Sequence, residues 1–395
     1  MKKLGFVTPW YGENIPGGAE MELRGLVSHL QEAGIELEIL TTCVKQFTSD
    51  WNVNYYKEGI DIVNGVRVIR FPVRKRDVVS FDAVNYKLMN NMPVTAEEEK
   101  IYQQEMVNSP RLYKYLEENK EKYGLYIFIP YMFGTTFYGA QVCPEKTVLI
   151  PCLHDESYAY MNCFKEVYSK ISGMIFHAKP ESELANRVYD LSNVNNGILG
   201  EGVYTDISSD AQRFRDKFKI NSPFILYAGR KDKGKNVDTL IKYFCEYKQR
   251  KQSDLKLVLI GGGEIDIPKE NKHEIIDYGF VDLQDKYDAC AAAEFLCQPS
   301  KNESFSLVIM ESWLCSRPVL VHEECAVTRN FAIESRGGLY FKDYFDFEGC
   351  LNFYLEHKDK AKLMGQNGRE YVLNNFAWDI IVDKYTKFFE ACEIR

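Results

Sequence analysis

Short apolar segments alternate with amphipathic helical segments in two separate parts of this 395-residue chain. The first part has apolar segments at 4–8 and 35–42 on either side of a helical pattern at 19–33. The alternation restarts at Phe224 and continues past the apolar segment 295–298. A strand that returns parallel through a helix makes a right-handed crossover. The sequence therefore predicts an α/β fold with two Rossmann-like, doubly wound sheets.

A segment rich in Gly, Asn and Ser, residues 193–210, separates the two parts and is interpreted as a linker. We expect an N-terminal domain over 1–200 and a C-terminal domain over 201–375. Residues 376–395 carry apolar side chains at helical spacing. Because the polar face of this helix mixes acids and bases, we expect it to pack as part of a core and not on a membrane.

Two stretches of the N-terminal part depart from the alternation. Residues 60–71 contain Asn64-Gly65, the dipeptide that favours a two-residue hairpin turn. Residues 77–120 are polar, rich in Tyr and partly helical, and we interpret them as an insertion.

Charge, cysteine content and hydropathy exclude several classes of protein. The formal net charge of -8 argues against bulk attraction to nucleic acid. The eleven cysteines contain no C-x-x-C pair, so we interpret them as thiols in a reducing compartment. No apolar run approaches the roughly 20 residues that span a bilayer. A cytoplasmic protein is expected.

Two carboxylates, Glu303 and Glu311, lie on either side of seven residues that are apolar or small. The stretch begins in a polar loop and continues as a helical pattern, with Ser306 as the expected N-cap. A helix N-terminus offers free N–H groups and partial positive charge to a phosphate. Eight residues of helix would separate the carboxylates by about 12 Å, so Glu303 must precede the helix. Carboxylates repel phosphate, and we expect both to hold hydroxyl groups of a sugar nucleotide.

A basic loop, residues 229–235, lies between a predicted strand and a predicted helix. Arg230 offers a planar fork and Lys235 a point charge, and both suit phosphate oxygens. The Walker register G-x-x-x-x-G-K-[ST] is absent. A solvated surface loop is the alternative, but loops at the carboxyl ends of strands are where α/β proteins bind ligands.

Two loops of the N-terminal part are further candidates. Gly17-Gly18 would let the backbone approach a phosphate, although a tight turn also needs glycine. His154 follows a predicted strand and precedes Asp155 and Glu156, which could hold its charge or fix its tautomer. A structural histidine is the alternative. Metal binding is disfavoured because no second His lies at ligand spacing, and no metal ligand is predicted.

Four stretches together resemble the family 4 retaining glycosyltransferases, also called glycosyltransferase group 1. The resemblance rests on these residues, in this order: Gly17-Gly18, Gly200-Glu201-Gly202-Val203, Gly229-Arg230 with Lys235, and Glu303 with Glu311. It implies the GT-B fold, in which two Rossmann-like domains face each other across a cleft. It also implies that the C-terminal helix crosses back to the N-terminal domain.

The resemblance implies a role for each candidate residue. Arg230 and Lys235 would neutralise the departing diphosphate, with backbone N–H groups at Ser306, Leu307 and Val308. Gly17 and Gly18 would close on the diphosphate. Glu303 would hold hydroxyls of the donor sugar, and His154 would lie beside that sugar. Glu311 would bind the ribose, while Gly262 and Val281 would flank the base.

The implied reaction is sugar transfer from a nucleotide-diphosphate sugar, with UDP favoured, to a glycan or lipid-linked acceptor, with retention of the anomeric configuration. We expect no metal and no cofactor, because fixed positive charge stabilises the leaving group. Synthesis of cell-surface polysaccharide or glycolipid would be the setting. The alternatives are a nucleotide-sugar epimerase of the same fold and a non-catalytic sugar-nucleotide or glycan-binding protein.

A basic cluster lies within the predicted hairpin and the residues after it. Its members are Arg67, Arg70, Arg74, Lys75 and Arg76. Such a cluster could contact anionic lipid headgroups at the inner face of a membrane. A solvated hairpin face is the alternative.

Overall fold

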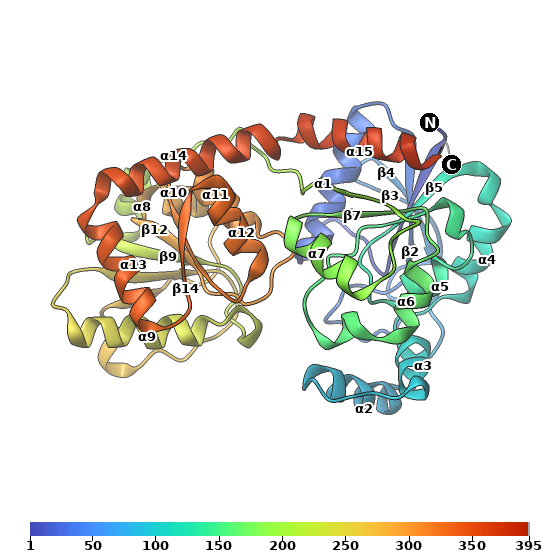
Figure 1. Ribbon diagram of the computed structural model, residues 1–395, viewed down its shortest axis with the longest axis horizontal. Helices are drawn as coiled ribbons and strands as arrows, with labels where there is room; N and C mark the ends of the chain where they lie inside the picture. The colour runs from blue at the N-terminus through green and yellow to red at the C-terminus, as the bar shows by residue number, and fades with distance from the viewer. Residues whose placement is uncertain (394–395) are drawn as a thin grey trace. The chain divides into compact units, whose positions relative to one another are not determined.

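The computed structural model describes residues 1–393, the side chain of Lys233 excepted, and these divide into two compact units (Figure 1). The first comprises residues 1–202 together with 378–393, and the second comprises Val203–Ala377. Each unit contains its own largely parallel sheet with helices around it. The predicted α/β fold with two Rossmann-like sheets is confirmed.

The first unit is built on a sheet of eight strands, in the order β3-β4-β2-β1-β5-β6-β7-β8. The strands are β1 Lys3–Thr8, β2 Leu37–Thr42, β3 Gly59–Val63, β4 Val66–Phe71, β5 Tyr123–Phe128, β6 Thr147–Leu149, β7 Gly173–Phe176 and β8 Asn195–Ile198. The chain leaves β1 for β2 on one side and reaches β5 on the other, so the order of the strands reverses between β1 and β5.

The predicted hairpin is confirmed at the edge of this sheet. β3 pairs antiparallel with β4, whereas the other strand pairs of the sheet are parallel. Asn64 and Gly65 have φ of 50° and 79°. Two successive positive φ values are those of a type I′ turn, whose twist matches that of the flanking strands.

Helices of the first unit follow the strands or form the insertion between β4 and β5. They are α1 Gly18–Glu32, α2 Val78–Met89, α3 Ala96–Glu105, α4 Pro110–Glu118, α5 Gly134–Gly139, α6 Asn162–Tyr168, α7 Lys179–Val188 and α15 Trp378–Glu393. Residues 77–120 are thus more helical than expected, because Asp77, Thr95 and Ser109 each cap a helix with their side chains.

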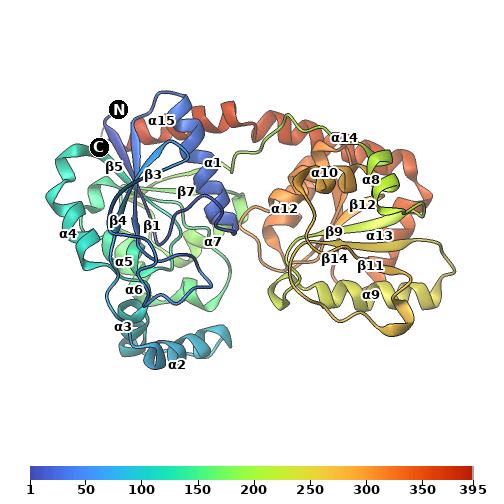
Figure 2. The same ribbon diagram turned by 180° about the vertical axis from the view of Figure 1, so that it is seen from behind.

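The C-terminal helix α15 packs within the first unit, as predicted (Figures 1 and 2). The Trp378 ring stacks on His29 of α1 at 4.1 Å between ring centroids. It lies so close to Gly25 that a Cβ there would meet the ring at 2.5 Å. At the other end of α15, the backbone N–H of Lys2 donates to Glu393 Oε1 at 2.8 Å, which brings the two ends of the described chain together.

The predicted linker begins too early. Asn195–Ile198 forms β8, which pairs in parallel with β7 and completes the first sheet. A strand of sequence Asn-Asn-Gly-Ile has none of the β-branched run that marks a buried strand, and its residues alternate between half-buried and exposed. The composition therefore favoured a loop where pairing with β7 imposes a strand.

The second unit contains a sheet of six parallel strands, in the order β11-β10-β9-β12-β13-β14. The strands are β9 Phe224–Ala228, β10 Lys256–Ile260, β11 Ile275–Asp277, β12 Phe295–Gln298, β13 Val319–His322 and β14 Gly338–Phe341. The helices are α8 Ala211–Phe218, α9 Val237–Arg250, α10 Leu283–Ala292, α11 Leu307–Leu314, α12 Ala326–Ser335, α13 Tyr344–Glu356 and α14 Lys358–Asn375. β9 and β12 are buried along their whole length, as expected of central strands.

Candidate functional site

The order of strands in the second unit reverses between β9 and β12. From β9 the chain continues to β10 and β11 on one side, and β12 leads to β13 and β14 on the other. β9 and β12 are neighbours, with Ile225 paired to Phe295. In open α/β sheets, ligands bind outside the carboxyl ends of the strands at this switch point. The loops that follow β9 and β12 therefore define the candidate site.

Two basic residues of the loop after β9 have different environments: Lys231 is buried and Arg230 is exposed. Lys231 is buried, where its Nζ pairs with Asp277 at 2.7 Å and donates to the Gly261 carbonyl at 2.7 Å. The side chain of Arg230 is 72% exposed, and its one ion pair with a described residue is a 3.5 Å contact with Asp232. Arg230 is thus free to turn toward an anion, whereas Lys231 holds the loop against its neighbours.

Lys235 and Glu303 join the two loops at the switch point. Lys235 Nζ lies 2.7 Å from Glu303 Oε1, and Gln298 Nε2 at the end of β12 donates to the same oxygen at 3.2 Å. Asn236 Nδ2 donates to the Pro299 carbonyl at 3.0 Å, which fastens the same loops a second time. The structure therefore brings these two predicted residues into direct contact.

The helix α11 begins at Leu307, so Glu303 precedes it, as the spacing required. Ser306 occupies the N-cap position with φ of 84°, but its side chain accepts no hydrogen bond from the helix. The predicted N-cap position of Ser306 is confirmed, but the side-chain hydrogen bond of such a cap is not formed. Within residues 1–393 the buried Oγ has no hydrogen-bond partner. The N–H groups of Leu307 and Val308 thus receive no cap from Ser306 and suit an anion.

Glu311 points from α11 to a partner that the sequence did not reveal. Its Oε1 lies 2.5 Å from Nζ of Lys286 on the neighbouring helix α10. The two residues are 25 positions apart and on different helices, so no spacing rule links them. The site thus contains two separate lysine–glutamate pairs, one in the loops and one between helices.

The predicted base-binding segments lie at the same edge of the second sheet. Gly262 is in the loop after β10, and Val281 follows β11. The loops approach one another closely, since Gly261 N–H donates to the Gly279 carbonyl at 2.7 Å. Gly261 has φ of 118°, and a Cβ there would overlap the Gly229 carbonyl. Glycine is therefore required where these loops meet.

In the first unit, Gly17 and Gly18 lie at the start of α1, and the carboxylate of Glu20 lies beside them. Gly17 has φ of 140°, and a Cβ there would overlap the Glu20 carboxylate. Trp10 Nε1 donates to Glu20 Oε1 at 2.6 Å, which holds the carboxylate over the start of the helix. Negative charge is stabilised there by the helix dipole. A phosphate approaching Gly17 and Gly18 must displace Glu20.

His154 lies in the loop after β6, and its acidic neighbours Asp155 and Glu156 have different partners. His154 Nδ1 is 3.8 Å from Glu156 Oε1, whereas Asp155 pairs with Arg187 at 2.8 Å. Burial raises the pKa of Glu156 to about 6, although a hydrogen bond from the Tyr131 hydroxyl acts in the opposite direction. Glu156 is therefore the acid placed to influence His154.

The raised pKa of Glu156 predicts a pH-dependent stability. A carboxyl whose folded pKa exceeds its ordinary value of 4.5 stabilises the fold fully below that value and loses the contribution as pH rises through about 6. We expect Glu156→Gln to raise the melting temperature by a few degrees near pH 8 and to leave it unchanged near pH 4.5. Thermal unfolding across this range measures it, with the exposed Glu166→Gln as the control. A pH-independent difference would contradict the assignment.

Within the basic cluster of the first unit, Arg70 is buried, whereas the other arginines have partners nearer the protein surface. Arg70 is 2% exposed, donates to the Tyr11 carbonyl at 2.9 Å and pairs with Asp61 at 3.3 Å. It cannot contact a headgroup. The partners of the others are Glu38 for Arg67, Glu105 for Arg74, and the rings of Trp51 and Phe81 for Arg76. Lys75 is exposed.

Comparison with known proteins identifies the second unit. Residues 208–371 match the model of the family described as glycosyl transferases group 1, and this range covers nearly all of the unit. The chain carries a group 1 glycosyl transferase domain. The family 4 resemblance is consistent with this match.

Two curated relatives of the chain are glycosyltransferases by name. One is an uncharacterized glycosyltransferase of Methanocaldococcus jannaschii, 24% identical over 45% of this chain and 47% of the relative. The other is the N-acetylgalactosamine-N,N'-diacetylbacillosaminyl-diphospho-undecaprenol 4-alpha-N-acetylgalactosaminyltransferase of Campylobacter jejuni, 32% identical over 34% of this chain and 37% of the relative. The chain thus spans less than half the length of either.

Solved structures show the fold of the whole chain. Sucrose-phosphate synthase of Thermosynechococcus elongatus is similar with a TM-score of 0.70 at 16% identity, over 99% of both chains. Anabaena HepE in complex with UDP is similar with a TM-score of 0.69 at 13% identity, over 99% of this chain and 100% of that one. The glycosyl transferase domain is therefore the second Rossmann-like unit of a GT-B fold. None of the helices within residues 1–393 has the length and hydropathy of a membrane-spanning helix.

Proposed function

We propose that this protein transfers a sugar from a nucleotide-diphosphate sugar to a hydroxyl group and retains the anomeric configuration. The observation that carries the proposal is the contact of Lys235 with Glu303 at the switch point, next to the uncapped start of α11. A cation, helix N–H groups and a carboxylate meet there, which suits a ligand with both phosphate and hydroxyl groups.

Lys235 and Glu303 are paired with each other, and each would take a new partner when the donor binds. A diphosphate carries more negative charge than one carboxylate, so it would draw Lys235 away from Glu303 Oε1, now at 2.7 Å. The released carboxylate would then accept hydrogen bonds from the donor sugar. Lys235 would thus neutralise the leaving group while Glu303 positions the sugar.

Charge on the departing diphosphate is the feature of the transition state that this site can stabilise. We propose that Arg230, Lys235 and the N-terminus of α11 supply positive charge to this diphosphate. Positive charge directed at the leaving group stabilises the transition state. We propose that transfer needs no metal ion and no cofactor at this point. Glu311, paired with Lys286, would accept the ribose hydroxyls.

The proposed donor is a UDP-sugar, and the proposed acceptor a glycan or lipid-linked glycan. The HepE structure was solved with UDP, and the name of the C. jejuni relative describes transfer to a diphospho-undecaprenol acceptor. We propose that the helices α2 to α4 shape the acceptor site, with His154 beside the donor sugar. The buried Arg70 removes the basic cluster as support for membrane contact, and such contact is left out of the proposal.

A transfer assay tests this function. The protein is incubated with a panel of UDP- and GDP-sugars and soluble analogues of lipid-linked acceptors, without added Mg²⁺ or Mn²⁺. We expect release of nucleoside diphosphate together with an acceptor heavier by one sugar in the mass spectrum, and an anomeric proton coupling that matches the donor. An inverted linkage would refute retention. A converted donor sugar without product would instead indicate an epimerase.

A further inference from the structure

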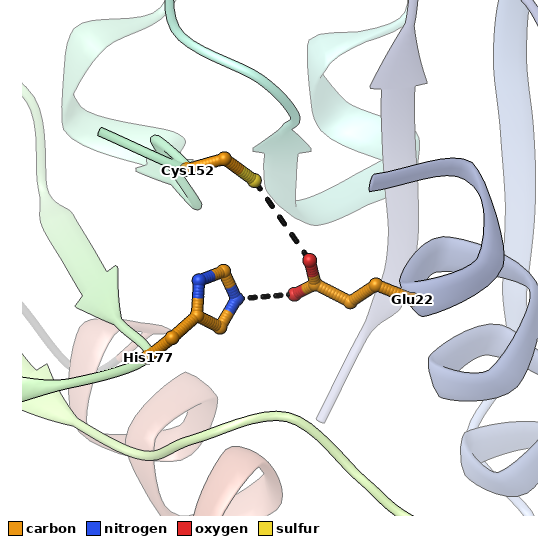
Figure 3. Close-up of side chains that lie close together, drawn as sticks. All are labelled: Glu22, Cys152 and His177. Atoms are coloured by element: carbon orange, nitrogen blue, oxygen red, sulfur yellow. Dashed lines mark hydrogen bonds and ion pairs between the residues drawn. The ribbon is translucent and has the colours of Figure 1, made fainter. Parts of the chain in front are cut away.

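Three potential metal ligands converge in the first unit, none of them among the residues assigned to the donor. Glu22 lies on α1, Cys152 follows β6, and His177 follows β7. One ligand atom from each lies within 4.8 Å of the others (Figure 3). Figure 3 shows the carboxylate between the thiol and the imidazole, with all three side chains pointing toward one another. Carboxylate, thiol and imidazole are each zinc ligands in proteins.

The distances among these atoms are close to those of a metal site. His177 Nε2 lies 2.6 Å from Glu22 Oε1, and Cys152 Sγ lies 3.8 Å from Glu22 Oε2. With zinc bonds of about 2.0–2.3 Å and tetrahedral angles, donor atoms lie roughly 3.2–3.8 Å apart. The sulfur–oxygen distance already agrees. The nitrogen–oxygen distance must open by less than about 1 Å, within reach of a rotation of the Glu22 side chain.

A second carboxylate supports the imidazole from behind. Glu181 Oε2 lies 3.5 Å from His177 Nδ1, on the opposite side of the ring from Glu22. Glu181 is held in place because it accepts backbone N–H groups from Leu153 at 2.7 Å and from His177 at 2.6 Å. A carboxylate on Nδ1 leaves Nε2 to bind an ion, as in the carboxylate–histidine–zinc arrangement.

Three carboxylates and one imidazole are buried together in this cluster. Glu22, Glu201 and His177 are 4%, 6% and 1% exposed, and Glu181 is 1% exposed. Buried carboxylates are expensive unless paired, and a divalent cation would balance them.

Hydrogen bonding alone accounts for only part of this arrangement. Glu22 and Glu181 lie at ion-pair distance from the two nitrogens of the His177 ring. The Cys152 thiol has one long hydrogen bond, to Glu22 Oε2 at 3.8 Å. Glu201 is buried and forms no ion pair within residues 1–393. A cation accounts for all of them at once.

We propose that Glu22, Cys152 and His177 bind a divalent transition-metal ion, with Zn²⁺ the ion that best suits one sulfur, one nitrogen and one oxygen donor. Mg²⁺ and Ca²⁺ prefer oxygen ligands and are disfavoured by the thiolate. The ion is structural and takes no part in the proposed sugar transfer. It ties the segment that carries His154, two residues after Cys152, to the helix that begins at Gly18.

Cobalt substitution tests the proposal without reference to activity. After removal of metal with a chelator, the full chain is titrated with Co²⁺ and then with Zn²⁺. We expect a single ion per chain and a thiolate-to-cobalt charge-transfer band in the near ultraviolet, which Zn²⁺ abolishes. Cys152→Ser should lose the band and weaken Zn²⁺ binding by about 10–100-fold. Cys163→Ser, a thiol of the same unit outside the cluster, should keep both properties.

The wild-type chain provides a second test that does not depend on the folding of a variant. Bound Zn²⁺ should protect Cys152 from alkylation by iodoacetamide, and a chelator should abolish the protection, as read by peptide mass spectrometry. Zn²⁺ should also raise the melting temperature. A wild-type protein without the charge-transfer band, a band that survives in Cys152→Ser, or alkylation of Cys152 unaffected by Zn²⁺ would each overturn the proposal.

Discussion

Lys235→Ala is expected to lower kcat about 100- to 1000-fold, the usual effect of removing one preorganised group that stabilises developing charge. Among the described residues, the ion pair of the Lys235 side chain is with Glu303, and the bond from the Lys235 backbone N–H to Asp232 survives in the alanine variant, so the fold should tolerate the change. The melting temperature should therefore change little. Turnover under saturating donor measures the effect, with thermal unfolding in parallel.

Two controls separate loss of charge from loss of structure. Lys242→Ala removes an exposed lysine of α9 and should leave turnover unchanged. The double variant Lys235→Ala with Glu303→Gln removes the unpaired carboxylate that the single variant leaves beside the diphosphate. The double variant should remain inactive because the Glu303 carboxylate is also needed to accept hydrogen bonds from the donor sugar. Wild-type turnover in Lys235→Ala would eliminate this lysine from the mechanism.

Glu311→Ala is expected to weaken binding of free UDP by about 10–100-fold, because hydrogen bonds to a charged group contribute about 1.5–3 kcal/mol. Glu311 is held by Lys286 at 2.5 Å, so its carboxylate is already oriented before the nucleotide binds. Isothermal titration calorimetry with UDP measures the loss.

Lys286→Ala serves as the companion variant. If Lys286 only orients Glu311, the affinity for UDP should fall by less than in Glu311→Ala, and a UDP analogue without ribose hydroxyls should bind both variants like wild type. Unchanged UDP affinity in Glu311→Ala would remove the ribose from this position.

Local sequence patterns were sufficient to predict the strands, loop and helix that carry the candidate site. Uninterrupted apolar runs such as 224–228 are typical of central strands of a parallel sheet, and their spacing predicted the crossovers. The separation of Glu303 from Glu311 required a loop followed by a helix, which the structure has. The dipeptide Asn64-Gly65 likewise predicted the hairpin turn that the structure has. These are features whose cause lies within a few residues.

Contacts between distant segments were not predictable in this way. Lys286 meets Glu311 because α10 packs beside α11, and Cys152 meets Glu22 across 130 positions because the loop after β6 lies beside the first turns of α1. The left-handed backbone of Ser306 depends on the packing around it. Arg70 is different, since alternation along β4 places it on the face of Val66 and Val68 and already indicated burial.

A crystal structure with UDP is the most direct test of the account. We predict that the diphosphate lies within hydrogen-bond distance of Lys235 Nζ and of the N–H groups that begin α11. Lys235 should have moved away from Glu303, and the ribose hydroxyls should contact Glu311. UDP bound elsewhere in the chain, or bound with the 2.7 Å Lys235–Glu303 contact intact, would contradict the assignment of the switch point as the donor site.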